Sequence, residues 1–326
     1  MSCLPRVLGV PRPRVTPGKG AILSADAVGY GAVLLATACW GTSGVFAKLI
    51  LAEGAVSALA LAFWRNLTTF IILLVGLGLL RPAWLRVRRS DIGWLVALGG
   101  SLGALHVFWF LSVSLNGAAV AVVQQAAMPA IVAVAAWLLW REPLSGRKLL
   151  AIALTFLGTV LVSGVGVLGG SDFTLSGLLV GLGTPLWYAA WNLFGKRLRG
   201  RYGPFTTLTY GFGFGALLLF PLQFTTPQPW PVSTTALLWF AGFIAVATIA
   251  GYATYTFALG RLPASVATIL AMAEIPFATL YAYALLGERL AVDQVLGAML
   301  VMVGVFVLSW RRARSRVSIR AQLEEV

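Results

Sequence analysis

The sequence predicts an all-α polytopic membrane protein with ten transmembrane helices in two inverted five-helix repeats. Of its 326 residues, 59% are hydrophobic and 10% are charged, whereas about a quarter of the residues in soluble domains are charged. Residues 92–140 and 202–260 contain no Asp, Glu, Lys or Arg, and each stretch is long enough for two spans of about 20 residues. The third observation is an internal repeat with a spacing of 146 residues.

The repeat relates residues 112–163 to residues 258–309. If an odd number of spans separates the two copies, the halves cross the bilayer in opposite directions, as in many secondary transporters. Chance similarity between apolar segments is the alternative explanation. Identical residues recur at the repeat spacing, among them Glu142 with Glu288 and Gly158 with Gly304.

Helices are the expected spanning elements, because the apolar segments do not alternate with polar residues as the strands of a membrane barrel do. Charged residues, Gly, Pro or Asn interrupt the hydrophobic runs. The ten expected spans are 30–50, 57–80, 92–114, 117–140, 147–168, 176–195, 204–222, 235–259, 264–286 and 292–310.

The basic residues predict the orientation. With both termini in the cytoplasm, every Lys and Arg except Lys48, Arg65 and Arg289 lies in a tail or a cytoplasmic loop, as the positive-inside rule requires. We therefore expect a multi-pass protein of the plasma membrane, and more narrowly of a bacterial cell membrane. Its expected parts are a disordered basic cytoplasmic tail at 1–28, a first five-helix repeat at 29–168, a second at 169–310 and a cytoplasmic tail at 311–326.

Four short motifs occur in order along the chain. They are Trp-Gly-Thr-Ser-Gly-Val-Phe-Ala-Lys at 40–48, Phe-Trp-Arg-Asn at 63–66, Trp-Arg-Glu-Pro-Leu at 140–144 and Leu-Gly-Glu-Arg-Leu at 286–290. These motifs resemble the first two spans, and the paired turns after spans 4 and 9, of the drug/metabolite transporter superfamily, specifically its EamA-like members. The resemblance covers about residues 30–310 and implies ten helices in two inverted repeats.

Ionisable and amide side chains inside the spans are the first candidates for a transport site. A charge in the hydrocarbon costs a few kcal/mol and tends to face the bundle interior. At 1.5 Å per residue, Arg65 lies roughly 12 Å below the outer end of span 2 and Glu274 roughly 15 Å above the inner end of span 9. His106, Gln124 and Gln125 fall in the same layer, so we expect these groups to meet around one central cavity.

Two interpretations of Arg65 and Glu274 are open. In one, Glu274 binds a proton or the ammonium group of a substrate, and Arg65 is its partner or an anchor for an anion. In the other, the two residues form a permanent ion pair that only joins two helices. The superfamily often has Glu directly before Pro in spans 4 and 9. Here Ala127 and Met128 precede Pro129 and Ile275 separates Glu274 from Pro276, so the resemblance assigns Glu274 no role.

Aromatic residues and prolines complete the candidate site. Pro129 and Pro276 lie near midplane in corresponding spans, where a missing hydrogen bond opens or kinks a helix; a static kink is the alternative. The aromatic candidates line a path for amphipathic solutes or stack on cations, with ordinary packing as the alternative. They are Trp40, Trp109, Trp187, Tyr188, Tyr252 and Tyr255.

These features predict a secondary active transporter that exports small metabolites, such as amino acids, amines or drug-like solutes, by alternating access. Proton coupling is one open alternative for its energy source, and a passive facilitator or channel is the alternative function. One histidine and a single deep acid give an enzyme little material, and no phosphate-binding loop is present. The expected partners are a small-molecule substrate and membrane lipid, with no nucleic acid, cofactor or metal, and with the oligomeric state undetermined. Glu142 and Glu288 are expected to cap helices or form local salt bridges outside the site.

Overall fold

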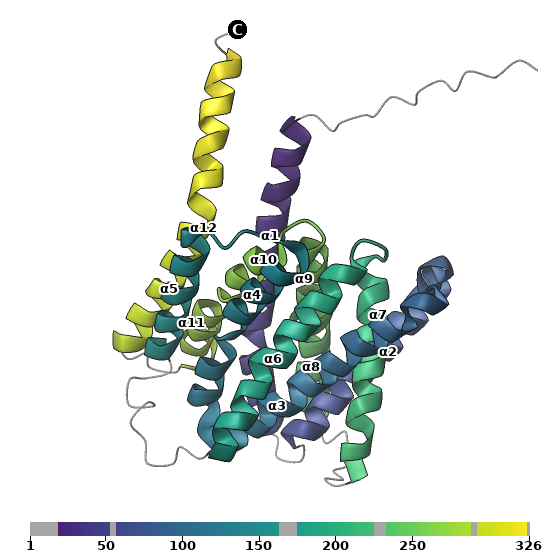
Figure 1. Cartoon of the computed structure of the whole chain (residues 1–326). Helices are drawn as coiled ribbons and strands as arrows, with labels where there is room; N and C mark the ends of the chain where they lie inside the picture. Colours follow the sequence, from purple (N-terminus) through teal and green to yellow (C-terminus); the bar gives the residue numbers. More distant parts are fainter. Residues whose placement is uncertain (1–18, 53–56, 163–174, 225–232, 288–291, 325–326) are drawn as a thin grey trace, which may run out of the picture.

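The computed structural model describes residues 19–52, 57–162, 175–224, 233–287 and 292–324, and it contains only helices and turns over these ranges (Figure 1). The all-α prediction is confirmed for this part of the chain. Short 3-10 helices are labelled η1, η2 and η4, and η5 is a π-helix. The elements in order are α1 (Lys19–Ala52), α2 (Ala58–Leu80), η1 (Pro82–Leu85), η2 (Arg89–Asp91), α3 (Ile92–Gln125), α4 (Met128–Trp140), α5 (Gly146–Val162), α6 (Leu175–Leu198), α7 (Pro204–Leu219), η4 (Phe220–Phe224), α8 (Thr234–Gly242), η5 (Phe243–Ala250), α9 (Gly251–Leu259), α10 (Ala264–Ala271), α11 (Glu274–Leu286) and α12 (Val292–Glu324).

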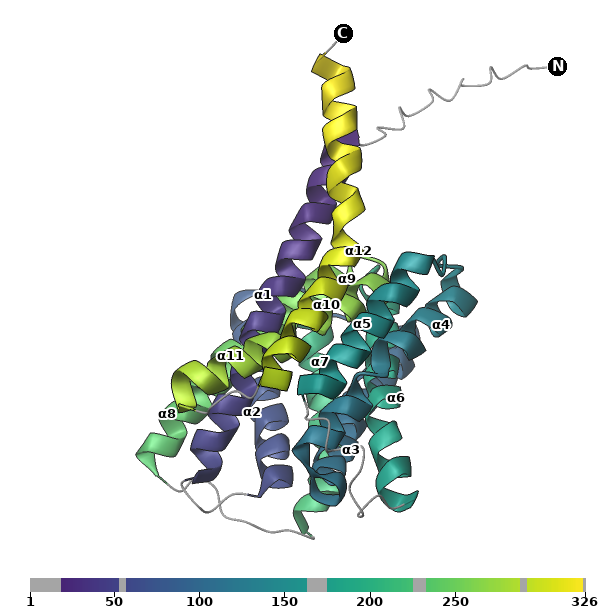
Figure 2. The same ribbon diagram turned by 90° about the vertical axis from the view of Figure 1, so that its left-hand side faces the viewer.

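Six helical segments in these ranges are long and apolar enough to cross a membrane, and shorter apolar helices lie at Met128–Trp140 and Val292–Leu308. The chain is therefore a membrane protein, and the count of ten spans stays a prediction. The N-terminal part of α1 and the C-terminal part of α12 extend from the same side of the bundle (Figures 1 and 2). The six segments are Ala27–Ile50, Leu59–Leu80, Arg89–Trp109, Pro204–Phe224, Thr234–Leu259 and Ala264–Leu286.

Both ends of the described chain are helical, which differs from the disorder expected before residue 29. α1 begins at Lys19, inside the stretch expected to be disordered, and α12 continues as a helix to Glu324. Residues 1–18 of the expected N-terminal tail lie outside the described residues. A polar, basic sequence next to a span can continue the helix of that span, because the first helical turns are already formed and each added residue gains a backbone hydrogen bond.

The boundary expected between spans 3 and 4 lies inside α3, which is helical from Ile92 to Gln125. Ser112 Oγ nevertheless donates a hydrogen bond of 2.8 Å to Gln124 Oε1. Twelve residues of straight helix would separate these positions by about 18 Å, far beyond the reach of the two side chains. α3 is therefore not straight between Ser112 and Gln124, the stretch that contains the expected boundary.

Two helices in different halves of the chain begin and end at equivalent positions of the 146-residue repeat. α4 and α11 each contain 13 residues and begin after a two-residue interruption, at 126–127 and at 272–273. Each ends at a residue with left-handed backbone, Arg141 with φ 54° and Gly287 with φ 68°. Every member of these pairs is 146 residues from its counterpart, so the sequence repeat is accompanied by a repeat of local structure.

The repeated glycines lie where α5 packs along α12. A Cβ atom on Gly158 would lie 2.7 Å from both Gly297 O and Val301 N, which is shorter than a van der Waals contact with backbone atoms. A Cβ atom on Gly304 would lie 3.1 Å from Ala151 O on the opposite helix. Each half thus contributes one glycine to a close helix crossing, as is common where helices associate in membranes.

We expect Gly158→Ala to destabilise the bundle by about 1–3 kcal/mol, because the new methyl group forces α5 away from α12. The melting temperature of the detergent-purified protein measures this effect. Gly100→Ala is the matched control, since a Cβ atom there has no neighbour within 4 Å and alanine favours the helix. Equal melting temperatures for the two variants would contradict the close crossing.

Candidate functional site

A central cavity of about 370 Å³ lies among α1, α2, α3, α6, η5, α9, α10 and α11. Both halves of the chain contribute to it. Most of its wall is apolar, and the polar groups come from a few side chains. The cavity brings together eight residues singled out in the sequence, namely Trp40, Arg65, His106, Trp109, Gln125, Tyr188, Tyr252 and Glu274.

Three other candidates do not line the cavity. Gln124 is buried and accepts the hydrogen bond from Ser112 described above. Trp187 packs against Phe108, with ring centroids 6.5 Å apart. Tyr255 is completely buried, and its hydroxyl donates to Asn192 Oδ1 at 2.5 Å.

Arg65 is fixed in the cavity wall by the π-helix η5. Its Nε donates to Thr248 Oγ1 at 3.0 Å, and its Cζ lies 4.7 Å from the ring centroid of Phe243 and 5.3 Å from that of Tyr252. Thr248 Oγ1 in turn donates to Phe243 O at 3.0 Å, a bond between residues five apart that the wider π turn allows. The π-helix therefore presents a hydroxyl and an aromatic face to one guanidinium.

Asn66 fixes the tautomer of His106. Its Nδ2 donates to Ala62 O at 2.7 Å and lies 3.0 Å from His106 Nδ1. Because the Ala62 carbonyl requires the amide nitrogen on this side, the second amide hydrogen meets Nδ1, which accepts it. The ring proton is then on Nε2, and the described residues offer this buried atom no hydrogen-bond partner.

Glu274 is the first residue of α11, directly after the interruption at 272–273. Its carboxyl group therefore lies at the end of the helix where the helix dipole favours a negative charge. Over the part of the chain that the structure describes, no acidic side chain lies within 4.0 Å of Arg65, so Glu274 and Arg65 line one cavity without forming a contact ion pair.

The two proline candidates lie in the first turns of the interrupted helices. Pro129 follows the first residue of α4, and Pro276 is the third residue of α11. The N–H groups of a first helical turn have no carbonyl partner within the helix, so proline, which lacks the N–H, loses no helical hydrogen bond there. Both prolines are therefore compatible with a helix that restarts at these positions. The two restarts leave short non-helical stretches, and the second one, at Met272, lines the cavity.

An aromatic cluster closes one end of the cavity. The ring of Trp40 lies 5.1 Å from that of Tyr252 and 4.9 Å from that of Tyr255, and Trp191 stacks on Tyr255 at 5.7 Å. Along α6 and α9, this cluster lies between the cavity and the α9–α10 connection. Each of these four aromatic side chains is at most 8% exposed, so the cluster is packed rather than open.

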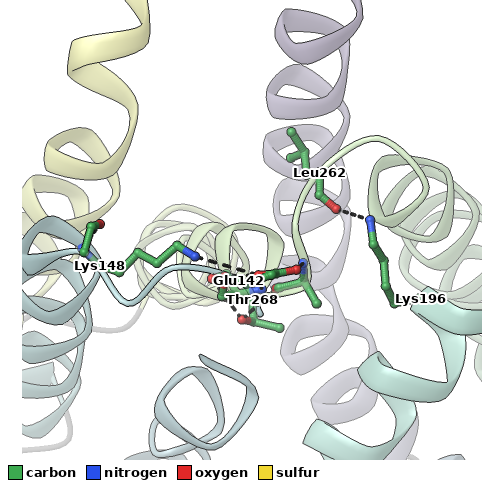
Figure 3. Close-up of polar contacts among 8 residues, drawn as sticks. Glu142, Lys148, Lys196, Leu262 and Thr268 are labelled. Atoms are coloured by element: carbon green, nitrogen blue, oxygen red, sulfur yellow. Dashed lines mark hydrogen bonds and ion pairs between the residues drawn. The ribbon is translucent and has the colours of Figure 1, made fainter. Parts of the chain in front are cut away.

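Beyond the cluster, Glu142 caps a helix of the other half (Figure 3). Its carboxylate accepts from the backbone N–H groups of Ala264 at 3.1 Å and Ser265 at 3.4 Å, and Lys148 Nζ lies 3.7 Å away. Both parts of the expectation for Glu142 hold, since it caps a helix and forms a salt bridge. Glu288, its counterpart in the repeat, lies outside the described residues.

Lys196 acts on the same connection from α6 (Figure 3). Its Nζ donates to Leu259 O at 2.9 Å and also to Leu262 O. A cation at the C-terminus of α9 and an anion at the N-terminus of α10 both complement the helix dipoles. The α9–α10 connection is thus held by residues of α6 and of the α4–α5 connection.

Sequence reasoning missed three residues of this site, Asn66, Phe243 and Thr248. Asn66 follows Arg65 directly, and a polar amide inside an apolar span is a signal that the sequence does contain. Thr248 is a weaker signal, because threonine is common in membrane helices, where its hydroxyl bonds a backbone carbonyl of its own helix. The role of Phe243 depends on the π-helix.

Comparison with known proteins agrees with this arrangement. The model of the EamA-like transporter family matches twice, at residues 27–164 and 175–310. The chain is 27% identical to the uncharacterized inner membrane transporter YicL of Salmonella typhimurium, over 87% of this chain and 96% of that protein. It is also 27% identical to the uncharacterized transporter YwfM of Bacillus subtilis, over 85% and 92%. One crystal structure shares the fold, with a TM-score of 0.71 at 20% identity, covering 89% of this chain and 98% of its own. The chain is a membrane protein that belongs to the EamA-like transporter family.

Proposed function

We propose that this chain is a secondary active transporter that exports small amphipathic metabolites across the plasma membrane by alternating access. The observation that carries the proposal is the cavity, which contains one carboxylate and one guanidinium that do not pair, among aromatic and aliphatic walls. Amino acids, amines and other drug-like solutes have the size and mixed polarity that such a cavity accommodates. Energy comes from an ion gradient or from the gradient of the substrate.

The two halves cross the bilayer in opposite directions in this proposal. Support comes from the match of α4 with α11, from the two matches of the family model, and from chain ends that extend from one side of the bundle (Figures 1 and 2). Each half contains five spans in this arrangement, and because five is odd the second half enters the membrane from the opposite face. Both termini are cytoplasmic by the distribution of Lys and Arg.

Cysteine labelling tests the inversion. Arg147 near the start of α5 and Asp293 near the start of α12 are 146 residues apart, so they occupy equivalent positions in the two halves. In a background without the native cysteines, Arg147→Cys is expected to react with an impermeant maleimide only from the cytoplasm, and Asp293→Cys only from outside. Labelling of both from one compartment would contradict the inverted arrangement.

The packed aromatic cluster at one end of the cavity favours a transporter over a channel, because an open channel has a continuous path that connects both sides of the membrane at the same time. Reconstitution into liposomes tests this directly. A transporter exchanges labelled substrate against an internal pool and accumulates it uphill when a proton or ion gradient is imposed. A channel shows neither, so the absence of both exchange and uphill accumulation would contradict the proposal.

A further inference from the structure

One buried hydrogen-bond donor that lines the cavity beside Asn66 has no acceptor in the part of the chain that the structure describes. His106 is only 8% exposed, and its protonated Nε2 has no partner among the described residues. A buried donor without a partner costs about 1–3 kcal/mol, so His106 Nε2 points to a ligand that supplies an acceptor.

The guanidinium of Arg65 also has no carboxylate in direct contact over the described ranges. Arg65 donates through Nε to Thr248 and also interacts with the Tyr252 hydroxyl, and its remaining N–H groups are left for another acceptor. In the region described, no carboxylate lies within 4.0 Å of it. A guanidinium edge matches the two oxygens of a carboxylate, and one further N–H from His106 completes the set.

We propose that Arg65 and His106 form a subsite for the carboxylate group of an amphipathic organic acid, with Asn66 as the positioning residue that keeps the proton on His106 Nε2. This rests on the proposed transport function and names its substrate class. One positive charge balances a carboxylate, whereas a phosphate dianion beside the carboxyl group of Glu274 would exceed it. The apolar body of the acid packs against cavity residues such as Leu105, Met272 and Ile275.

Three probes with one carbon skeleton test the subsite. 3-Phenylpropionate, 3-phenylpropan-1-ol and 3-phenylpropylamine differ only in the head group, which is anionic, neutral or cationic. Calorimetric titration of the full-length protein in lipid nanodiscs gives each dissociation constant. We expect the acid to bind at least about tenfold more tightly than the alcohol, the effect of a hydrogen bond to a charged group.

Two substitutions of His106 separate recognition from packing. The amide nitrogen of glutamine reaches the position of Nε2, whereas that of asparagine reaches the position of Nδ1. His106→Gln is therefore expected to keep the preference for the acid over the alcohol, and His106→Asn to reduce it by about tenfold. The melting temperature is the control for folding and is expected to be the same in both variants.

Four results would each overturn the carboxylate subsite. In the wild type they are equal affinities for the acid and the alcohol, no binding of any probe, or tightest binding of the amine. The fourth is an equal loss of the preference for the acid in both His106 variants. None of these results decides the transport function, which substrate exchange in liposomes tests separately. Loss of that exchange with a retained preference for the acid would overturn the transport proposal and leave the subsite standing.

Discussion

Replacing Glu274 by glutamine is expected to abolish uphill transport in proteoliposomes while leaving substrate exchange measurable. Glutamine keeps the size of the side chain and accepts hydrogen bonds, but its amide group does not bind or release a proton as a carboxyl group does. In the cavity, Glu274 is the acidic side chain that both lines the wall and lies beside the restart of α11. If protons drive export, this carboxyl group has to exchange one in each cycle.

The assay compares accumulation under an imposed proton gradient with exchange of labelled substrate at equal pH on both sides. Asp293→Asn is the matched control, because it neutralises an acid in the first turn of α12, outside the cavity. Its uphill transport is expected to equal that of the wild type. Full accumulation by the Glu274→Gln variant would remove Glu274 from the coupling mechanism.

The meeting of Arg65, His106 and Glu274 in one cavity was predictable from the sequence, but the direction of each candidate side chain was not. A helix rises 1.5 Å per residue, so counting from the span ends places Arg65, His106 and Glu274 in one layer, and all three line the cavity. Gln124 and Tyr255 also face the bundle interior, yet they turn toward Ser112 and Asn192. Facing direction depends on which helix packs beside the residue, and one sequence does not contain that information.

The interruptions of the helices show the same limit. Pro129 and Pro276 mark the two restarts within three residues, because proline is stable in a first turn. Nothing in Phe243–Ala250 marks a π-helix, since its apolar residues are typical of any membrane span. The contact that gives this segment its role comes from Arg65, which is 183 residues away from Thr248 in the chain.

The second large effect is expected for Arg65→Lys. Lysine keeps the positive charge but loses Nε, its hydrogen bond to Thr248 and the flat face that lies against Phe243 and Tyr252. A flexible ammonium group no longer presents a fixed pair of donors to the cavity. We expect initial rates of transport to fall by about 10- to 100-fold, the range for losing a charge-assisted contact.

Thr248→Val separates charge from geometry. It removes the hydroxyl that accepts from Arg65 but leaves the guanidinium and both ring contacts, so its effect is expected to be about tenfold or less. The melting temperatures decide between a transport role and a structural one. If Arg65 only joined α2 to η5, Arg65→Lys and Thr248→Val would lower stability in parallel with the loss of transport. A large loss of transport by Arg65→Lys at an unchanged melting temperature is the result that identifies Arg65 as a residue of the transport site.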